Sequence, residues 1–228
     1  MEFDRETFLE VPAAGALLRG DLGIPPRAAG VVLFAHGSGS SRHSPRNRFV
    51  AAELRRRGLA TLLTDLLTPE EEAVDLRTAQ YRFDIPLLGR RLVGLVDWLT
   101  EHPQTKALRI GLFGASTGAA AALIAAAERP EAVRAVVSRG GRPDLAASVL
   151  DRVRAPTLLI VGGADLPVLR INEEALQRLR CVKRLVVVPG SGHLFEEPGA
   201  LEEVARLAAE WFGQYLSRTS EAQMPDCR

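Results

Sequence analysis

The stretch Gly114-Ala115-Ser116-Thr117-Gly118 determines how the rest of this chain is interpreted. An apolar run, 108–113, precedes it, and a run of small residues, 119–127, follows it. This order predicts a strand, a sharp turn and a helix, with Ser116 at the apex of the turn. The small flanking residues let the turn close without collisions and hold the serine in a strained conformation. We therefore predict a nucleophilic serine; the alternative is a tight packing turn with an inert serine.

Apolar strands and helices alternate along the rest of the chain. The runs 6–11 and 16–22 flank a short turn and predict an antiparallel hairpin. Buried strands are expected at 30–35, 59–63, 108–113, 133–137, 156–161 and 184–188. Helices are expected at 45–58, 83–99, 119–127, 143–150, 168–179 and 198–216, whereas the polar stretch 68–80 is expected to be a surface excursion. The pattern predicts an α/β fold with a mostly parallel sheet of about eight strands, helices on both faces and no lid domain.

Composition limits the classes of protein to which the chain can belong. Its 228 residues, 46% hydrophobic and 25% charged, predict a single domain over 1–217 and a flexible C-terminal tail over 218–228. A net charge of +1 gives no global attraction to nucleic acid, and no apolar run is long enough to span a membrane. The charged N-terminus does not resemble a signal peptide, and Cys181 and Cys227 lie far apart as expected of free thiols. These features predict a cytoplasmic location.

A serine nucleophile needs a base, and the base needs an acid to orient it. The chain has four histidines, His36, His43, His102 and His193. His193 lies in a glycine-containing loop directly after the last strand, and Asp165 follows the strand before that one. Both loops are expected at the same edge of the sheet as Ser116. The sequence therefore predicts a catalytic triad of Ser116, Asp165 and His193.

Other interpretations of these residues stay open at this point. Asp165 is also placed as a turn residue or as a cap for the helix that follows it, and His193 taken alone is also consistent with an ordinary loop histidine. The rival acids are Asp65, Glu196 and Glu197. His102 lies in a charged stretch away from any strand end, and none of the histidines has metal-ligand spacing, so neither a metal nor a cofactor is expected.

The loop His36-Gly37-Ser38-Gly39 follows a buried strand and predicts half of an oxyanion hole. An oxyanion hole needs two N–H donors aimed at the developing negative charge. We expect Thr117 N–H to be one donor and Ser38 N–H the other, with Gly39 N–H as the second choice. His36 is expected to hold this loop by its side chain, not to act as a base.

Basic residues follow two of the predicted loops. Arg42, His43, Arg46 and Arg48 come after the oxyanion loop, and Arg139 and Arg142 follow the strand 133–137. We predict an anion-recognising rim in which Arg42, His43, Arg46 and Arg139 contact substrate, because a guanidinium binds carboxylate or phosphate with two parallel hydrogen bonds. The alternative is a set of solvated surface arginines that pair with Glu70-Glu71-Glu72.

These motifs together resemble the dienelactone hydrolase-like group of α/β hydrolases. Ser116, Asp165 and His193 occur in the chain order of that fold. The stretches 36–48, 115–118 and 137–142 are also similar to a bacterial hydrolase module found fused to phosphoribosyltransferase domains. The resemblance implies an α/β-hydrolase fold and a hydrolytic activity. Dienelactone hydrolases carry cysteine where this chain has Ser116, which favours ordinary ester cleavage over dienelactone cleavage.

The expected function is hydrolysis of small or medium carboxylic esters, anionic ones included, through an acyl-enzyme. A thioesterase or a lactone or amide hydrolase would use the same residues. A binding or regulatory module that keeps the fold without turnover is the alternative from another class. The expected partner is a small-molecule ester, with no nucleic acid and no membrane, and the chain is expected to be a monomer or a homodimer.

Overall fold

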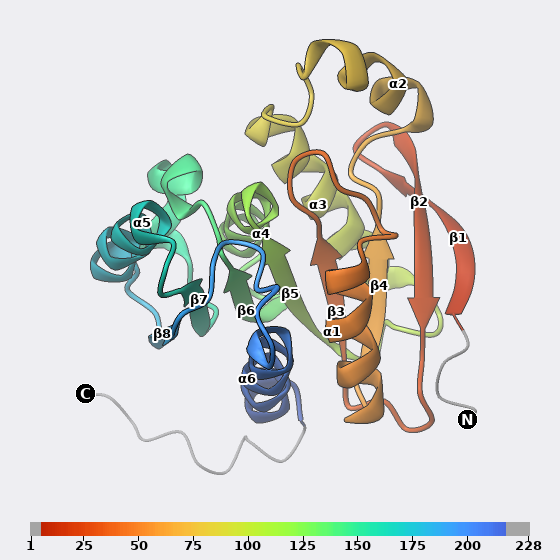
Figure 1. The fold of residues 1–228 in the computed structure, drawn as a ribbon. Helices are drawn as coiled ribbons and strands as arrows, with labels where there is room; N and C mark the ends of the chain where they lie inside the picture. The colour runs from red at the N-terminus through yellow and green to blue at the C-terminus, as the bar shows by residue number, and fades with distance from the viewer. Residues whose placement is uncertain (1–5, 218–228) are drawn as a thin grey trace.

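An eight-stranded sheet forms the centre of the computed structural model, which describes residues 6–217. The strands are β1 (Glu6–Ala13), β2 (Ala16–Gly23), β3 (Gly30–Ala35), β4 (Ala60–Thr64), β5 (Arg109–Ala115), β6 (Val133–Arg139), β7 (Thr157–Gly162) and β8 (Lys183–Val188). Their order in the sheet is β1-β2-β4-β3-β5-β6-β7-β8 (Figure 1). Strands β3 to β8 are parallel, whereas β2 pairs antiparallel with both β1 and β4. The predicted fold class is confirmed.

Three of the helices begin at a residue whose side chain caps the first turn. The helices are α1 (Pro45–Arg56), α2 (Pro69–Thr78), α3 (Ile85–Glu101), α4 (Thr117–Glu128), the 3₁₀ helix η1 (Pro143–Arg152), α5 (Leu166–Arg178) and α6 (Ala200–Leu216). The Ser44 side chain accepts a hydrogen bond from the backbone N–H of Asn47 at the start of α1. Asp84 caps α3 in the same way by accepting from the N–H of Leu87. These caps satisfy N–H groups that have no partner inside the helix.

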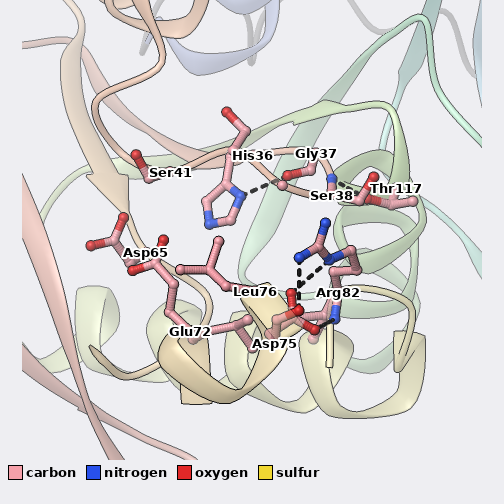
Figure 2. A pocket seen from close by; sticks show the side chains of 14 residues that line it. His36, Gly37, Ser38, Ser41, Asp65, Glu72, Asp75, Leu76, Arg82 and Thr117 are labelled. Atoms are coloured by element: carbon pink, nitrogen blue, oxygen red, sulfur yellow. Dashed lines mark hydrogen bonds and ion pairs between the residues drawn. The ribbon is translucent and has the colours of Figure 1, made fainter. Parts of the chain in front are cut away.

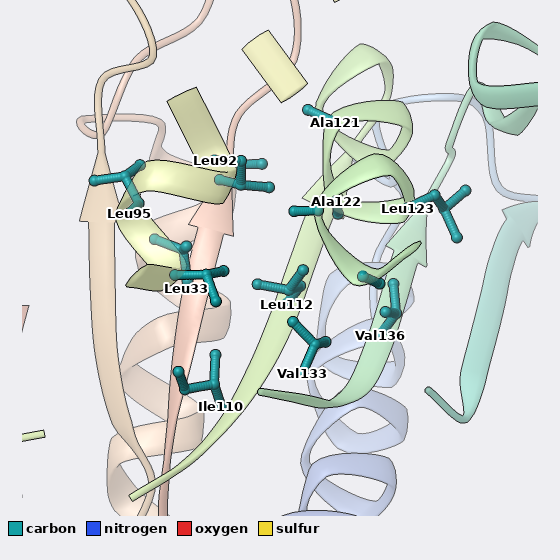
Figure 3. Close-up of a cluster of buried hydrophobic side chains, with 14 of the residues drawn as sticks. Leu33, Leu92, Leu95, Ile110, Leu112, Ala121, Ala122, Leu123, Val133 and Val136 are labelled. Atoms are coloured by element: carbon teal, nitrogen blue, oxygen red, sulfur yellow. The ribbon is translucent and has the colours of Figure 1, made fainter. Parts of the chain in front are cut away.

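Helices cover both faces of the sheet and bury two separate clusters of apolar side chains (Figure 1). Helices α3 and α4 pack on one face, where Leu92 and Leu95 meet strand residues such as Leu33 and Leu112 (Figure 3). Helices α1 and α6 pack on the other face, around Phe34, Phe113 and Phe212. Burial on both faces explains why the central strands read as continuous apolar runs. The packed layers hold the carboxyl ends of β3, β5, β6 and β7 at one edge.

Two parts of the sequence interpretation need comment. The stretch 68–80 lies mostly at the surface, as expected, but it also forms helix α2, which was not predicted from the sequence. Thr68 and Glu71 form a reciprocal capping box at its start, a signal that the acidic composition concealed. The predicted tail, 218–228, lies outside the described residues. Within the part of the chain that the structure describes, no helix is long and apolar enough to cross a membrane.

Candidate active site

Ser116 lies at a strained turn between β5 and α4. Its backbone φ is +51°, an angle that residues other than glycine rarely adopt. A Cβ on Gly118 would come within 2.2 Å of the Ala35 carbonyl oxygen, and one on Gly114 within 2.4 Å of the Ala119 Cα. The Ser116 N–H donates to the Arg139 carbonyl at 3.1 Å, which ties the turn to the end of β6. Glycine at these two positions therefore permits the close packing that strains the serine.

Ser116, His193 and Asp165 form a continuous chain of contacts. His193 Nδ1 lies 2.7 Å from Asp165 Oδ2, and His193 Nε2 lies 3.3 Å from Ser116 Oγ. Asp165 stands at the first position before α5, yet its side chain makes no capping hydrogen bond there. Its carboxylate faces the imidazole instead. Asp165 is therefore the N-cap residue of α5 by position, but its side chain does not cap the helix.

The rival acids are each engaged elsewhere. Asp65 accepts hydrogen bonds from the backbone N–H and the guanidinium of Arg42. Glu197 accepts from the Gly192 N–H at 2.9 Å, and Glu196 lies 3.3 Å from Arg46. The Glu197 contact helps to shape the loop that carries His193. Among residues 6–217, Asp165 is the carboxylate in hydrogen-bond contact with His193.

The loop that carries His193 is anchored on both sides. Phe195 is 1% exposed and packs into the cluster under α1 and α6, so the loop is held to the core directly after the histidine. The Ala164 N–H donates to the Ser191 carbonyl at 2.9 Å, which joins the loop to the segment before Asp165. A Cβ on Gly162 would lie 2.3 Å from that same carbonyl oxygen. Close backbone packing thus fixes the base and the acid relative to each other.

His36 holds the loop after β3, as predicted. Its Nδ1 donates to the Gly37 carbonyl at 2.9 Å, and its Nε2 accepts from the Leu66 N–H at 3.1 Å. These two bonds require a neutral ring, and burial lowers the pKa of His36 below its ordinary value. The remaining histidines lie apart: His43 is exposed, and His102 stacks on Trp98 at the end of α3. No three metal-ligating side chains gather in the described ranges.

The oxyanion loop has a contact that the sequence did not indicate. The Ser38 N–H donates to the Thr117 side-chain oxygen at 2.8 Å, across 79 positions of sequence. Figure 2 shows this bond beside the His36–Gly37 bond. Thr117 N–H opens helix α4 and has no acceptor inside that helix. Of the two predicted donors, Thr117 N–H has no hydrogen-bond acceptor among residues 6–217, whereas Ser38 N–H already donates to the Thr117 hydroxyl.

The segment 37–40 lines two cavities. The smaller, about 50 Å³, includes Leu76 of α2 and the Asp75–Arg82 ion pair (Figure 2). The larger, about 210 Å³, is lined by two of the catalytic candidates, Ser116 and His193. Its lining residues are Gly37, Ser38, Ser40, Ser44, Arg46, Asn47, Ala115, Ser116, Arg139, His193 and Leu194. Of these, Ser44 and Asn47 were not predicted as site residues, although the Ser44-Pro45 helix start marks their position.

The predicted basic rim separates into two groups. Arg42 pairs with Asp21 and Asp65, and it does not line the larger cavity; nor does His43. Arg46 and Arg139 do line it. Arg48 pairs with Glu6 and Asp21, and Arg142 pairs with Asp144. Pairing with Glu70-Glu71-Glu72 is therefore wrong as the account of these arginines, because their partners in the described chain are hairpin carboxylates, Asp65, Asp144 and, for Arg46, Glu196.

Most of the chain matches a known family. A model of the dienelactone hydrolase family matches residues 18–217 of the chain. The chain belongs to this family. Membership of the dienelactone hydrolase family and the α/β-hydrolase fold indicate a hydrolase.

Individual relatives place the chain within the dienelactone hydrolase family. The crystal structure of a dienelactone hydrolase from Anabaena variabilis is 64% identical, with a TM-score of 0.92, and the match covers 93% of this chain and 98% of that one. A Xanthomonas campestris protein described as an α/β serine hydrolase without a lid has a TM-score of 0.74 at 21% identity, over 95% of this chain and 97% of that one. This second likeness concerns the fold alone.

Two proteins from Mycobacterium tuberculosis strains CDC 1551 and H37Rv, provisionally named phosphoribosyl transferases, are each 55% identical over 212 residues. The match covers 93% of this chain but 47% of each relative. The chain thus spans about half the length of these curated relatives. The rest of each relative lies outside the match with this chain.

Proposed function

We propose that the chain is a serine hydrolase that cleaves carboxylic esters of small or medium size through an acyl-enzyme. The observation that supports this most is the contact chain from Asp165 Oδ2 through His193 to Ser116 Oγ, with distances of 2.7 and 3.3 Å. A base within hydrogen-bond reach of a serine, and itself oriented by a carboxylate, is the arrangement that activates a hydroxyl nucleophile.

In the proposed reaction, Ser116 Oγ attacks the ester carbonyl carbon while His193 Nε2 takes its proton. Asp165 accepts from Nδ1–H, which leaves Nε2 free to act as the base. The bond from the acyl carbon to the alcohol oxygen then breaks, and the alcohol leaves with the proton that His193 carried. Water attacks the acyl-enzyme, giving one proton to His193, which returns it to Ser116 Oγ as the acid is released.

The negative charge of each tetrahedral intermediate needs fixed donors. Thr117 N–H, at the start of α4, is the first donor in this proposal, and the helix dipole adds to its effect. Ser38 N–H is the second, shared with the Thr117 hydroxyl that it already contacts at 2.8 Å. Gly39 N–H is the alternative.

The proposed substrate size follows from the cavity. A volume of about 210 Å³ beside Ser116 lies below the roughly 300–1,000 Å³ of pockets that enclose drug-sized ligands. A short acyl chain fits this space, whereas a long one would extend into solvent. We expect kcat/KM for p-nitrophenyl esters to be highest between acetate and hexanoate and to fall by at least tenfold at palmitate.

The test is steady-state hydrolysis of the p-nitrophenyl series by the purified chain and by Ser116→Ala. Hydrolysis that disappears in the variant, while its circular dichroism spectrum and Tm stay close to the wild type, would support the proposal. Turnover in Ser116→Ala above a tenth of the wild-type rate would refute the assigned nucleophile. Equal rates for butyrate and palmitate would refute the assigned substrate size.

A further inference from the structure

The guanidinium of Arg139 is buried without a partner. The residue is 7% exposed, and within residues 6–217 neither Nε nor Nη1 makes a hydrogen bond. Burial lowers the pKa of Arg139 to about 10, and the positive charge of Arg46 adds to that effect. A buried cation that lacks an anion is costly to the folded state. Another interaction must therefore offset the free-energy cost of burying this charge.

Arg139 faces the same cavity as the catalytic candidates. It lines the space of about 210 Å³ together with Ser116 and His193. Its backbone is fixed to the nucleophile, because Ser116 N–H donates to the Arg139 carbonyl and Arg142 N–H donates to the Ser116 carbonyl, both at 3.1 Å. The backbone position from which the Arg139 side chain extends is therefore fixed relative to the proposed nucleophile by the end of β6.

The other lining residues reinforce the positive character of this cavity. Arg46 lies on the first turn of α1, and its contact with Glu196 is long, 3.3 Å, with the glutamate side chain 67% exposed. Asn47, 1% exposed, has an unpaired Oδ1, an acceptor available to a hydroxyl group. The N-terminus of α1 adds a partial positive charge. Among the described residues that line the cavity, none is Asp or Glu.

We infer that Arg139 is a substrate-binding residue that holds a carboxylate or phosphate group of the ester, with Arg46 as the second cation. This inference rests on the proposed function and narrows its substrate class to anionic esters. The planar fork of Arg139 offers two parallel donors to such an oxyanion, and Asn47 Oδ1 accepts from a hydroxyl beside it. The bound anion would then provide the negative charge that Arg139 lacks within the described chain.

The first experiment compares three 4-nitrophenyl esters of similar length at constant ionic strength: the pentanoate, the glutarate monoester and a phosphonobutanoate. We expect kcat/KM for at least one anionic ester to exceed that for the pentanoate about tenfold or more, as charged hydrogen bonds imply. The ratio of kcat/KM for the anionic ester to kcat/KM for the pentanoate should fall towards one in Arg139→Gln. In Arg139→Lys this ratio should be intermediate. The better of the two anionic esters identifies carboxylate or phosphate as the preferred group.

Arg142→Gln is the matched control. It removes the same charge three positions after Arg139, from a side chain that is paired with Asp144. The ratio should stay at the wild-type value in this variant. A wild-type ratio near one, or a ratio that survives Arg139→Gln, would overturn the inference.

A binding measurement separates this inference from the proposed function. In Ser116→Ala, glutarate or inorganic phosphate should raise Tm relative to chloride at the same ionic strength, and Arg139→Gln in that background should abolish the shift. A Tm shift without hydrolysis of any ester would refute the hydrolase proposal and keep the anion site. Hydrolysis of the pentanoate without any anion-dependent shift would refute the anion site alone. If Arg139→Gln fails to fold, Arg139→Lys carries both tests, with a weakened ratio and a reduced shift expected.

Discussion

His36 and His193 occupy comparable positions and have opposite environments. Each lies in a glycine-containing loop after a parallel strand, at the same edge of the sheet. The His36 ring is held by two backbone groups, the Gly37 carbonyl and the Leu66 N–H. The His193 ring meets two side chains, Asp165 and Ser116, and is 38% exposed. One ring has both nitrogens committed to the backbone, while the other has a nitrogen directed at a hydroxyl beside a cavity.

This difference distinguishes a histidine that positions a loop from the histidine that we propose as the catalytic base. A ring whose nitrogens are both fixed to backbone groups cannot change its proton without breaking a bond that shapes the loop. A ring between a carboxylate and a hydroxyl can take up and release a proton while its orientation is kept. Substitutions at the two sites should therefore affect different observables.

The largest expected effect is on turnover in His193→Ala. Loss of the base should lower kcat for p-nitrophenyl butyrate by about 10⁶, the size of effect seen when a triad member that acts as base is removed. The Tm should change little, because the imidazole is partly exposed. Stopped assays with background subtraction measure the residual rate. A loss of less than tenfold would mean that His193 and His36 do not differ as described.

Asp165→Asn should have the next largest effect. Asparagine keeps the shape but can present a donor to Nδ1, which favours the wrong tautomer, so kcat should fall by about 10⁴. Asp65→Asn and Glu197→Gln are the matched controls, since both carboxylates contact other groups. If Asp65→Asn abolished turnover and Asp165→Asn did not, the acid would be misassigned.

Thr117→Val tests the bond between Ser38 N–H and the Thr117 hydroxyl, which joins the two halves of the proposed oxyanion hole. Valine has nearly the same shape but no acceptor, so the Ser38 N–H loses its fixed direction. We expect kcat to fall by roughly tenfold, less than the loss of a whole donor, with KM changed less than kcat. Thr117→Ser keeps the hydroxyl and should retain most of the activity. An unchanged or raised kcat in Thr117→Val would show that the hydroxyl competes for the N–H instead of orienting it.

His36→Asn should have the smallest effect on turnover and a clear effect on stability. Burial lowers the pKa of His36 in the folded chain. Below about pH 6.5, His36 is therefore protonated in the unfolded chain before it is protonated in the folded chain. The stability that neutral His36 contributes is thus present above that pH and is lost as the pH falls.

The measurement is urea unfolding of wild type and His36→Asn from pH 5 to pH 8. The difference in unfolding free energy should be largest at pH 8, about 1–2 kcal/mol for two hydrogen bonds, and should shrink towards pH 5. A difference that stays constant across this range would contradict the neutral, doubly bonded ring.

Much of this arrangement could be predicted because it depends on local patterns. The strand before Ser116 and the glycines around it are adjacent in sequence, and parallel strands bring their carboxyl ends to one edge. Helix α2 was missed although Thr68 and Glu71 carry a capping signal, because its acidic composition suggested a loop. Here the local signal was present and was outweighed by composition.

Contacts between distant segments could not be predicted. The Ser38–Thr117 bond joins two loops that are 79 positions apart in sequence. Arg42 pairs with Asp21 of the hairpin and with Asp65, and Arg48 pairs with two carboxylates of the hairpin. A basic stretch gives the same pattern whether its arginines are paired or free. Only the three-dimensional structure distinguishes Arg42, which is paired with two carboxylates, from Arg139, which has no counter-charge in the described chain.

The measurement that tests the central claim most directly is covalent trapping of the nucleophile. The chain is treated with a fluorophosphonate, and the adduct is located by intact-mass and peptide mass spectrometry. The account predicts one adduct per chain, on Ser116, absent from Ser116→Ala and strongly slowed in His193→Ala, with Arg142→Gln labelled at the wild-type rate. Labelling at another residue, or none at Ser116 in a folded protein, would contradict it.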